Sequence, residues 1–378
     1  MDGRVGEVMR LFLRLGVTGF GGPAAHVALM EDACVRVRGW VTREEFADLL
    51  GAANVLPGPS STELAMLLGH RRAGWLGLVV AGVGFIVPAV VIVWVVAWWY
   101  GKVGARPEVA AMLVGMQPVV VAVVLQAVWR LGRSVVNGWA SGVIAVGSFV
   151  ALVMGVHELI VLVGASVVAT GVREGANVRE RAALVGVAGL AAPVGAAAIA
   201  GSGATVGGVF ASFLKIGCLV FGSGYVLLAF MRAEFVQRHA WLTEGQLLDA
   251  IAIGQVTPGP VFSTATFVGF VLAGHAGAAA ATIGIFLPAF LMAAVSGVVV
   301  GRVRRSARAA AALDGVNAAS LALMAMAVVL LSRGAVASPY GGLVTVTAIG
   351  LLMTTRIGAA WLLLGGAALG LLRVVGGG

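Results

Sequence analysis

The feature that most constrains the fold of this chain is a repeat, because one stretch of sequence occurs twice, 201 positions apart. Phe12-Leu13-Arg14-Leu15-Gly16 returns as Phe213-Leu214-Lys215-Ile216-Gly217, and Pro57-Gly58-Pro59 returns as Pro258-Gly259-Pro260. Between residues 12–59 and 213–260, fifteen of forty-eight positions are identical without a gap. The chain therefore contains two versions of one unit. We expect a first repeat over 1–182, a linking membrane segment within 183–206 and a second repeat over 207–378.

The composition is that of a polytopic membrane protein. Of the 378 residues, 60% are hydrophobic and 11% are charged, whereas a soluble chain carries about 25% charged residues. The mean hydropathy is +1.03, and apolar runs exceed the roughly 20 residues that a helix needs to cross a bilayer. Helix is the expected spanning structure, because hydrocarbon offers no partner to free backbone groups. No run alternates as barrel strands do, so the predicted fold class is all-α.

We expect about 10 to 13 membrane segments in this chain. They are 8–24, 46–69, 74–100, 108–130, 137–155 and 157–172 in the first unit, 183–200 in the linker, and 207–231, 246–272, 274–300, 310–331, 340–355 and 358–375 in the second unit. Glycine or proline interrupts the first two segments of each unit. The sequence leaves open whether these broken segments span the membrane or re-enter as hairpins.

The charges of equivalent loops predict that the two units are inverted. After its broken segments the first unit has Arg71-Arg72, whereas the second has no Lys or Arg. After the next helix the bias reverses. The loop of the first unit has only Lys102 and Arg106, whereas the equivalent loop of the second unit has four arginines between 302 and 308. Under the positive-inside rule, opposite biases place the units upside down relative to each other. Two parallel copies with a chance asymmetry are the alternative.

The net charge of +9 does not indicate nucleic-acid binding, because the basic residues are scattered in short loops as membrane anchors are. The two cysteines, Cys34 and Cys218, occupy unrelated repeat positions and form no CxxC pair. With five scattered histidines, the sequence predicts no metal site, no disulfide framework and no cofactor.

The Pro-Gly-Pro motifs predict helix breaks inside apolar segments. Proline removes an intrahelical hydrogen bond and clashes with the preceding turn, which costs about 3 kcal/mol in a helix interior. A helix that starts after such a break exposes free N–H groups and the positive end of its dipole, which bind anions. Two inverted units with broken helices near the midplane are typical of secondary transporters. A structural kink without a ligand is the alternative.

The expected substrate-binding residues surround these breaks in both units. They are Gly21, Gly22, Pro23, Asn54, Pro57, Gly58, Pro59, Ser60, Ser61, Gly222, Ser223, Gly224, Gln255, Pro258, Gly259, Pro260, Ser263 and Thr264. Hydroxyls after a break can cap the new helix or bind an oxyanion.

The same residues carry a resemblance to a known family. The stretch Phe20-Gly21-Gly22-Pro23-Ala24-Ala25-His26, then Trp40, Phe46 and Pro57-Gly58-Pro59-Ser60-Ser61-Thr62-Glu63 resembles the chromate ion transporter family. Phe221-Gly222-Ser223-Gly224-Tyr225 with the second Pro-Gly-Pro does so too, and the length resembles the long-chain, two-domain members. The resemblance implies a protein of the bacterial inner membrane that exports chromate, driven by the proton gradient. The second unit departs from the motif, which puts a strictly symmetric site in doubt.

Four titratable residues in or beside the broken apolar segments are candidates for charge attraction or proton coupling. Arg14 and Lys215 are repeat-related and are expected either to draw a dianion into the cavity or to snorkel to the interface. Glu63 is either a capping acid of the helix after the break or a proton carrier for antiport. His26 is a second proton-carrier candidate, or else a polar residue satisfied at the break.

Other polar residues match across the units. The pairs are Asn54 with Gln255, Asp48 with Asp249, and Gln117 with Asn317. The amides suit oxyanion hydrogen bonds or interhelical contacts, and the last pair is expected to line the cavity. The aspartates are expected at helix starts beside Thr42 and Thr243. Trp94, Trp98, Trp99 and Tyr100 are expected to form an interfacial belt.

The sequence therefore predicts a secondary transporter that exports chromate by proton antiport and confers chromate resistance. Uptake or exchange of sulfate or another oxyanion is the close alternative, because these dianions are so similar in size and charge. An anion channel is a less favoured class, since inverted broken repeats are typical of alternating access. An enzyme is not expected without a nucleotide motif or a redox cysteine pair. Protons and the lipid bilayer are the other expected partners, and a homodimer is one alternative for the oligomeric state.

Overall fold

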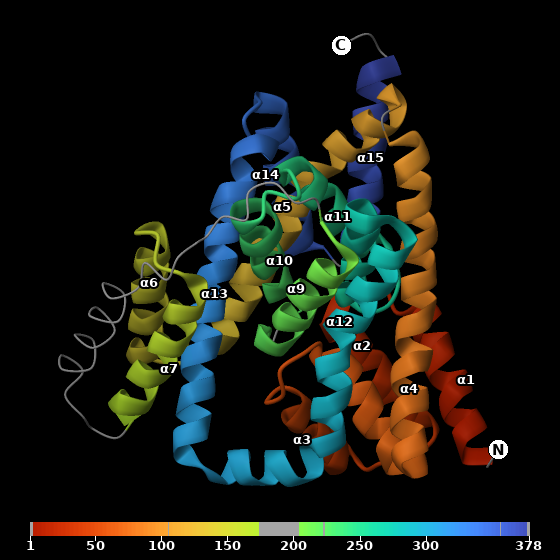
Figure 1. Cartoon of the computed structure of the whole chain (residues 1–378), viewed down its shortest axis with the longest axis vertical. Coiled ribbons are helices and arrows are strands. Elements are labelled where there is room, and N and C mark those ends of the chain that lie inside the picture. Colours follow the sequence, from red (N-terminus) through yellow and green to blue (C-terminus); the bar gives the residue numbers. More distant parts are fainter. Residues whose placement is uncertain (1–2, 105, 174–203, 222–223, 356, 376–378) are drawn as a thin grey trace.

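The computed structural model describes residues 3–104, 106–173, 204–221, 224–355 and 357–375, and its regular structure there is helical (Figure 1). The first unit contains α1 (Gly3–Thr18), α2 (Gly22–Glu31), the π-helix η1 (Asp32–Val37), α3 (Arg43–Ala53), α4 (Ser60–Val103), α5 (Pro107–Val135), α6 (Trp139–Val153) and α7 (Glu158–Arg173). The second contains α9 (Val206–Leu219), α10 (Val226–Met231), the π-helix η2 (Arg232–Arg238), α11 (Glu244–Val256), the 3₁₀ turn η3 (Val261–Ser263), α12 (Thr264–Arg305), α13 (Ala307–Ala335), α14 (Pro339–Thr354) and α15 (Ala359–Val375). The expected linker segment 183–200 lies outside the described residues, as do Gly222 and Ser223.

Matching capping boxes start α3 and α11. The Thr42 hydroxyl accepts the backbone N–H of Glu45, and the Glu45 side chain accepts that of Thr42. Thr243 and Gln246 make the same reciprocal pair in the second unit. The prediction that helices start beside these threonines is confirmed.

Helices α4 and α12 each consist of two arms that fold back on each other. At Gly74 the backbone takes φ 62° and ψ −153°, which is a conformation open essentially to glycine alone. Beyond this turn Gly77 packs against Gly69, so closely that an added Cβ on Gly77 would lie 2.1 Å from the Gly69 carbonyl oxygen. In a straight helix these residues would be about 12 Å apart. Gly269, Gly274 and Gly277 repeat the arrangement in α12.

The broken segments re-enter and do not span. Trp40, after η1, donates its indole N–H to Glu7 at the start of α1 (3.2 Å), so the chain returns to the level at which it entered. Arg71, at the end of the first arm of α4, likewise pairs with Glu45 at the start of α3 (2.5 Å). Each pair closes the base of a hairpin whose tip lies inside the protein. The described residues of the tips are 19–21 and 54–59, and in the second unit 220–221, 224–225 and 257–260.

The two units run in opposite directions. In Figure 1 the long second arm of α4 ascends, whereas the equivalent arm of α12 descends. The local packing is nevertheless the same, because Gly16 on α1 lies against Pro88 of α4 and Gly217 on α9 lies against Pro288 of α12. Equivalent contacts with reversed direction are the mark of an inverted repeat.

The helices that follow interlock the units. α5 of the first unit packs on α14 and α15 of the second, and α13 of the second packs on α6 and α7 of the first. The long arms of α4 and α12 also pack on each other at the centre. The helices from α5 to α7 and from α13 to α15 therefore pack mainly against the other unit, whereas α1 packs on α4 and α9 on α12 within each unit.

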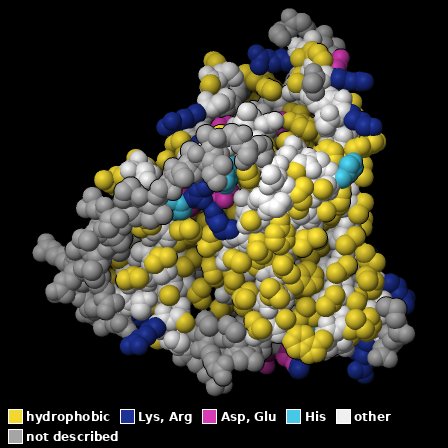
Figure 2. All heavy atoms as spheres, in the orientation of Figure 1, with side chains coloured by type: hydrophobic (Ala, Val, Ile, Leu, Met, Phe, Trp, Pro, Cys, Tyr) yellow, Lys and Arg dark blue, Asp and Glu magenta, His cyan; other side chains and the backbone are white. Residues whose placement is uncertain are grey.

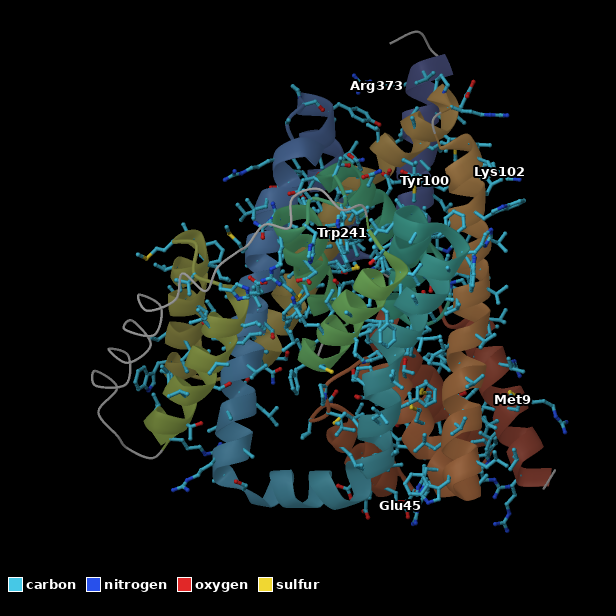
Figure 3. The ribbon with its side chains drawn as sticks, viewed as in Figure 1. Met9, Glu45, Tyr100, Lys102, Trp241 and Arg373 are labelled. Atoms are coloured by element: carbon cyan, nitrogen blue, oxygen red, sulfur yellow. The ribbon has the colours of Figure 1, made fainter. Side chains whose placement is uncertain are left out.

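The outer surface fits a bilayer. Figure 2 shows a hydrophobic band over the middle of the molecule, with most of the visible Lys and Arg toward the two ends and one basic group at mid-height. In Figure 3 Glu45 lies at one end and Lys102 and Arg373 lie at the other. Within the described residues, four helices are long and apolar enough to cross a membrane, namely Ser60–Val103, Pro107–Val135, Val261–Ser296 and Ala307–Ala335, and shorter apolar helices accompany them. The chain is a multi-pass membrane protein.

Candidate functional site

The four hairpin tips meet at the centre of the protein through reciprocal backbone contacts. Gly58 of the first Pro-Gly-Pro donates its N–H to the carbonyl oxygen of Val220 (2.8 Å). Gly259 of the second Pro-Gly-Pro donates its N–H to the carbonyl oxygen of Gly19 (2.8 Å). Each Pro-Gly-Pro therefore bonds to the Phe-Gly break of the other unit, which the sequence could not indicate.

The glycines at these contacts are required by geometry. Gly58 has φ +137° and Gly259 has φ +91°. An added Cβ on Gly58 would lie 3.1 Å from the Cβ of Ala289, and one on Gly259 would lie 2.6 Å from the Cβ of Ala89. The tip of each unit thus lies directly against the long arm of the other.

The two Phe-Gly breaks face each other across the same centre. The Tyr225 hydroxyl lies 3.1 Å from the position of an added Cβ on Gly22, and it hydrogen-bonds the side chain of Gln255. Pro23 lies against Gly224. Tyr225 occupies the position that Ala24 has in the first unit, so only the second unit places a large side chain between the two breaks.

His26 connects the first break to the start of α4. Its Nε2 lies 3.0 Å from the carbonyl oxygen of Gly19, and its Nδ1 lies 3.4 Å from the hydroxyl of Ser61. The ring is 1% exposed and packs edge-on against Phe85. Because a carbonyl accepts only, Nε2 carries the proton that faces Gly19. His26 thus stabilises the carbonyl that also accepts the N–H of Gly259.

Glu63 is the exceptional side chain of this region. It is fully buried, and within the described part of the chain neither carboxyl oxygen has a hydrogen-bond partner. One of them, Oε1, lies 2.8 Å from where a Cβ on Gly58 would be, so the carboxyl group folds back on the Pro-Gly-Pro tip. An unpaired ionised carboxylate costs several kcal/mol in apolar surroundings. The hydroxyls of Thr62 and Ser263 and the Nε2 of Gln255 are also buried without a partner there.

The second unit differs from the expected mirror image. Residues 261–263 form the 3₁₀ turn η3 before α12 begins at Thr264. The Thr264 hydroxyl donates to the carbonyl oxygen of Val261 (2.7 Å) and is therefore occupied within its own turn. The first unit starts α4 directly at Ser60, with the backbone N–H groups of Thr62 and Glu63 bonded to Pro59.

A polar cavity of about 340 Å³ reaches the tips of the first unit. It is lined by Pro23, Asn54, Leu131, Ser134, Val135, Asn137, Asp314 and Asn317. A second cavity of about 320 Å³ continues it and shares Val135, Asn137 and Asp314. The cavity therefore brings together Pro23 and Asn54 with Asn317, whereas Gln255, the repeat mate of Asn54, is buried.

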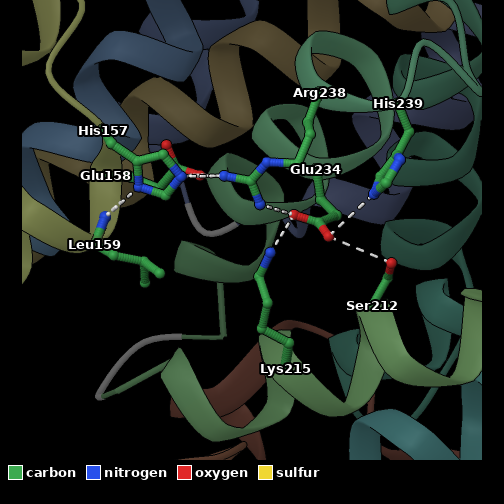
Figure 4. Close-up of polar contacts among 8 residues, drawn as sticks. All are labelled: His157, Glu158, Leu159, Ser212, Lys215, Glu234, Arg238 and His239. Carbon is green, nitrogen blue, oxygen red and sulfur yellow. Dashed lines mark hydrogen bonds and ion pairs between the residues drawn. The ribbon is translucent and has the colours of Figure 1, made fainter. Parts of the chain in front are cut away.

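The repeat-related cations Arg14 and Lys215 have different environments. Arg14 is exposed on α1. Lys215 donates to the carboxylate of Glu234 (2.5 Å), which is buried and also accepts from Arg238 (2.5 Å) and Ser212 (3.3 Å) (Figure 4). Of the two cations expected either to draw in a dianion or to snorkel, Lys215 is thus paired with Glu234, and Arg14 is exposed.

This cluster also connects the units. Arg238 reaches from η2 to Glu158 of α7 (3.3 Å) and contacts His157, which precedes α7 (Figure 4). His239 lies 3.4 Å from Glu234 on the other side. One sequence difference indicates this arrangement. Glu234 corresponds to Ala33 in the first unit, so only the second unit has a carboxylate at this position.

A third buried carboxylate, Asp249, was expected to lie at a helix start. It lies inside α11 and accepts from the Tyr100 hydroxyl (3.1 Å) and from the Gln117 amide (3.3 Å). Trp94 bonds to the exposed His275 (3.0 Å). Of the residues expected to form an aromatic belt, Tyr100 therefore turns its hydroxyl to a buried carboxylate, whereas Trp98 and Trp99 are exposed.

Fold and site together define a class, a multi-pass membrane protein of two inverted repeats whose re-entrant tips meet at one buried centre. The sequence profile of the family described as Chromate transporter matches residues 6–170 and again 207–371. The chain belongs to this family.

Relatives of known name support this membership. The chain is 34% identical over 328 residues to a chromate transport protein of Pseudomonas aeruginosa, covering 84% of this chain and 79% of the relative. It is 28% identical over 372 residues to a chromate transport protein of Cupriavidus metallidurans, covering 96% and 91%. An uncharacterized transporter of Bacillus subtilis is 28% identical over 138 residues, which are 36% of this chain and 78% of that shorter relative. No solved structure matches the chain.

Proposed function

We propose that this protein exports chromate in exchange for protons and thereby protects the cell from chromate. The family and the names of its relatives support the substrate. Broken helices that start at buried tips support an oxyanion site, because helix N-termini and hydroxyls bind such groups. The cavity beside Asn54 supports access to that site from one face.

The observation that carries the coupling is the buried, unpartnered carboxyl group of Glu63 at the first Pro-Gly-Pro. A proton on Glu63 neutralises the centre, whereas its loss places a negative charge where a dianion would bind. Like charges repel, so the protonation state of Glu63 controls whether a dianion can bind, and this links chromate transport to protons. The direction of the exchange is what the vesicle assay below tests.

The remaining described residues of the proposed site lie at or beside the hairpin tips. They are Gly21, Gly22, Pro23, Asn54, Pro57, Gly58, Pro59, Ser60, Ser61, Gly224, Gln255, Pro258, Gly259, Pro260 and Ser263. Gly222 and Ser223, which are outside the described residues, are proposed from the sequence motif alone. The Nε2 group of Gln255 and the hydroxyl of Ser263 are buried without a partner within the described residues, so a bound oxyanion would satisfy them.

The test is chromate accumulation in everted vesicles energised by respiration, with and without a protonophore. The wild type is expected to accumulate chromate in a protonophore-sensitive way, and sulfate is expected to compete. Glu63→Gln is expected to lose the proton-driven accumulation and to retain chromate counterflow, with exposed Glu44→Gln as the matched control. Accumulation by Glu63→Gln equal to that of wild type would remove Glu63 from the coupling. No accumulation by wild type over protein-free vesicles would remove chromate export.

A further inference from the structure

The two repeat-related halves of the centre are in different states. In the second unit Asp249 is buried and bonded to Gln117. In the first unit the repeat mates are Asp48, which is exposed, and Asn317, which lines the cavity. Asp249 and Gln117 are therefore joined in a buried pair, whereas Asn317, the repeat mate of Gln117, lines an open cavity.

The next layer toward the tips shows the same difference. Asn54 is exposed and lines the cavity, whereas its repeat mate Gln255 is 8% exposed and bonded to Tyr225. An inverted repeat whose halves differ in this way has one face open and the other closed. The difference extends over two layers of matched residues, so it belongs to the conformation of the whole unit.

The closed layer lies on the face opposite the cavity. The cavity is lined by α5 from Leu131 onward, and Gln117 precedes Leu131 on the same helix by fourteen residues, or about 21 Å. Tyr100 lies toward the end of the molecule that carries Lys102 and Arg373 (Figure 3). Cavity and closed layer therefore stand on opposite sides of the tips.

We propose that Tyr100, Gln117 and Asp249 form the second gate of the transport path, and that its opening makes Gln117 and Gln255 the lining of an exit cavity. Asp48 and Asn317 form the matching gate on the present cavity side and close when the second gate opens. This inference rests on the proposed function and names the residues that give the substrate its second route.

The chemistry of the gate fits an anion path. While the gate is closed, Asp249 accepts two hydrogen bonds from neutral donors. When it opens, the amide of Gln117 and the hydroxyl of Tyr100 are released, and both can donate to an oxyanion. The carboxylate repels a dianion, so the closed gate also opposes passage electrostatically.

The two gates differ by one donor. The repeat mate of Tyr100 is Val300, so the gate of Asp48 and Asn317 has no phenol to contribute. The second gate therefore has one side-chain hydroxyl donor that the first gate lacks at the matched position. This difference favours the state seen here, with the Asn54 cavity open.

Cysteine labelling tests the gate without any substrate. In a Cys218→Ser background, with the native Cys34 buried, Asn54→Cys and Gln255→Cys are made separately and treated with a membrane-impermeant thiol reagent in everted and right-side-out vesicles. Asn54→Cys is expected to react from one face, and Gln255→Cys is expected to be protected. Adding Asp249→Asn, which weakens the charged hydrogen bonds, is expected to speed labelling of Gln255→Cys about tenfold, from the opposite face.

Asp48→Asn is the matched control, and it is expected to leave the labelling of Gln255→Cys unchanged. Equal labelling with and without Asp249→Asn would overturn the gate, and so would an equal acceleration by both asparagine variants. Because labelling needs no chromate, its failure would remove the gate alone. Failure of vesicle accumulation would remove the proposed function and leave the labelling result intact.

Discussion

Gly58 donates its backbone N–H to the carbonyl oxygen of Val220 across the boundary between the two units, at 2.8 Å. The same contact recurs 201 positions further along, from Gly259 to Gly19, also at 2.8 Å. Each tip is therefore held by the other unit, and neither Pro-Gly-Pro can shift without moving the opposite break. This coupling is what a transporter with two alternating faces needs at its centre.

Gly58→Ala is expected to abolish chromate accumulation and to destabilise the fold by about 1 to 3 kcal/mol, because the residue has a positive φ and its new Cβ would press on Glu63 and Ala289. Thermal unfolding in detergent and vesicle uptake measure the two effects. Gly147→Ala is the control, since an added Cβ there meets nothing within 4 Å. Wild-type uptake by Gly58→Ala would show that the tip does not need its observed conformation.

Lys215→Met is expected to lower stability by about 1 to 2 kcal/mol and to leave the apparent KM for chromate unchanged, because Glu234 already neutralises this lysine. The double variant with Glu234→Gln is expected to regain part of the stability, since no buried carboxylate is then left short of a cation. Unfolding of the single and double variants gives the coupling energy. A raised KM in Lys215→Met alone would favour the charge-attraction role instead.

Glu7→Gln is expected to flatten the acid limb of the stability curve. Glu7 precedes the apolar segment 8–24, and its hydrogen bond from Arg72 (2.8 Å) holds its pKa below the ordinary value of 4.5, against the raising effect of partial burial. A lowered folded-state pKa stabilises the protein above pH 4.5 and loses this effect as pH falls through the lower value. Unfolding midpoints of wild type and variant between pH 6 and 3 measure it. Parallel curves would mean that this ion pair adds nothing measurable.

Much of the architecture could be predicted from the sequence. Sequence identity indicates the repeat, and hydrophobicity indicates the helical class. Charge bias predicts the inversion, and capping residues predict the helix starts at Thr42 and Thr243. Whether the broken segments re-enter was left open, although Gly69, Gly74 and Gly77 recur 200 positions later. Three glycines at a repeated turn are a usable sign of a tight helical hairpin.

The candidate site was less accessible to prediction. The bond from Gly58 to Val220 joins residues whose proximity depends on the whole fold, so no local pattern indicates it. Repeat equivalence was misleading where the surroundings differ. Lys215 meets Glu234, whose repeat mate is alanine, and Tyr100 meets Asp249, whereas its own repeat mate is valine.

Helix α5 packs on α14 and α15, which the ribosome makes much later, and this order has a consequence for biosynthesis. About two hundred residues separate the end of α5 from the start of α14, so at roughly 5 to 20 residues per second the ribosome needs about 10 to 40 s to supply the missing partners. During that interval α5 stays in the bilayer with a face that only lipid covers. The nascent first half must therefore wait for the second before its packing is complete.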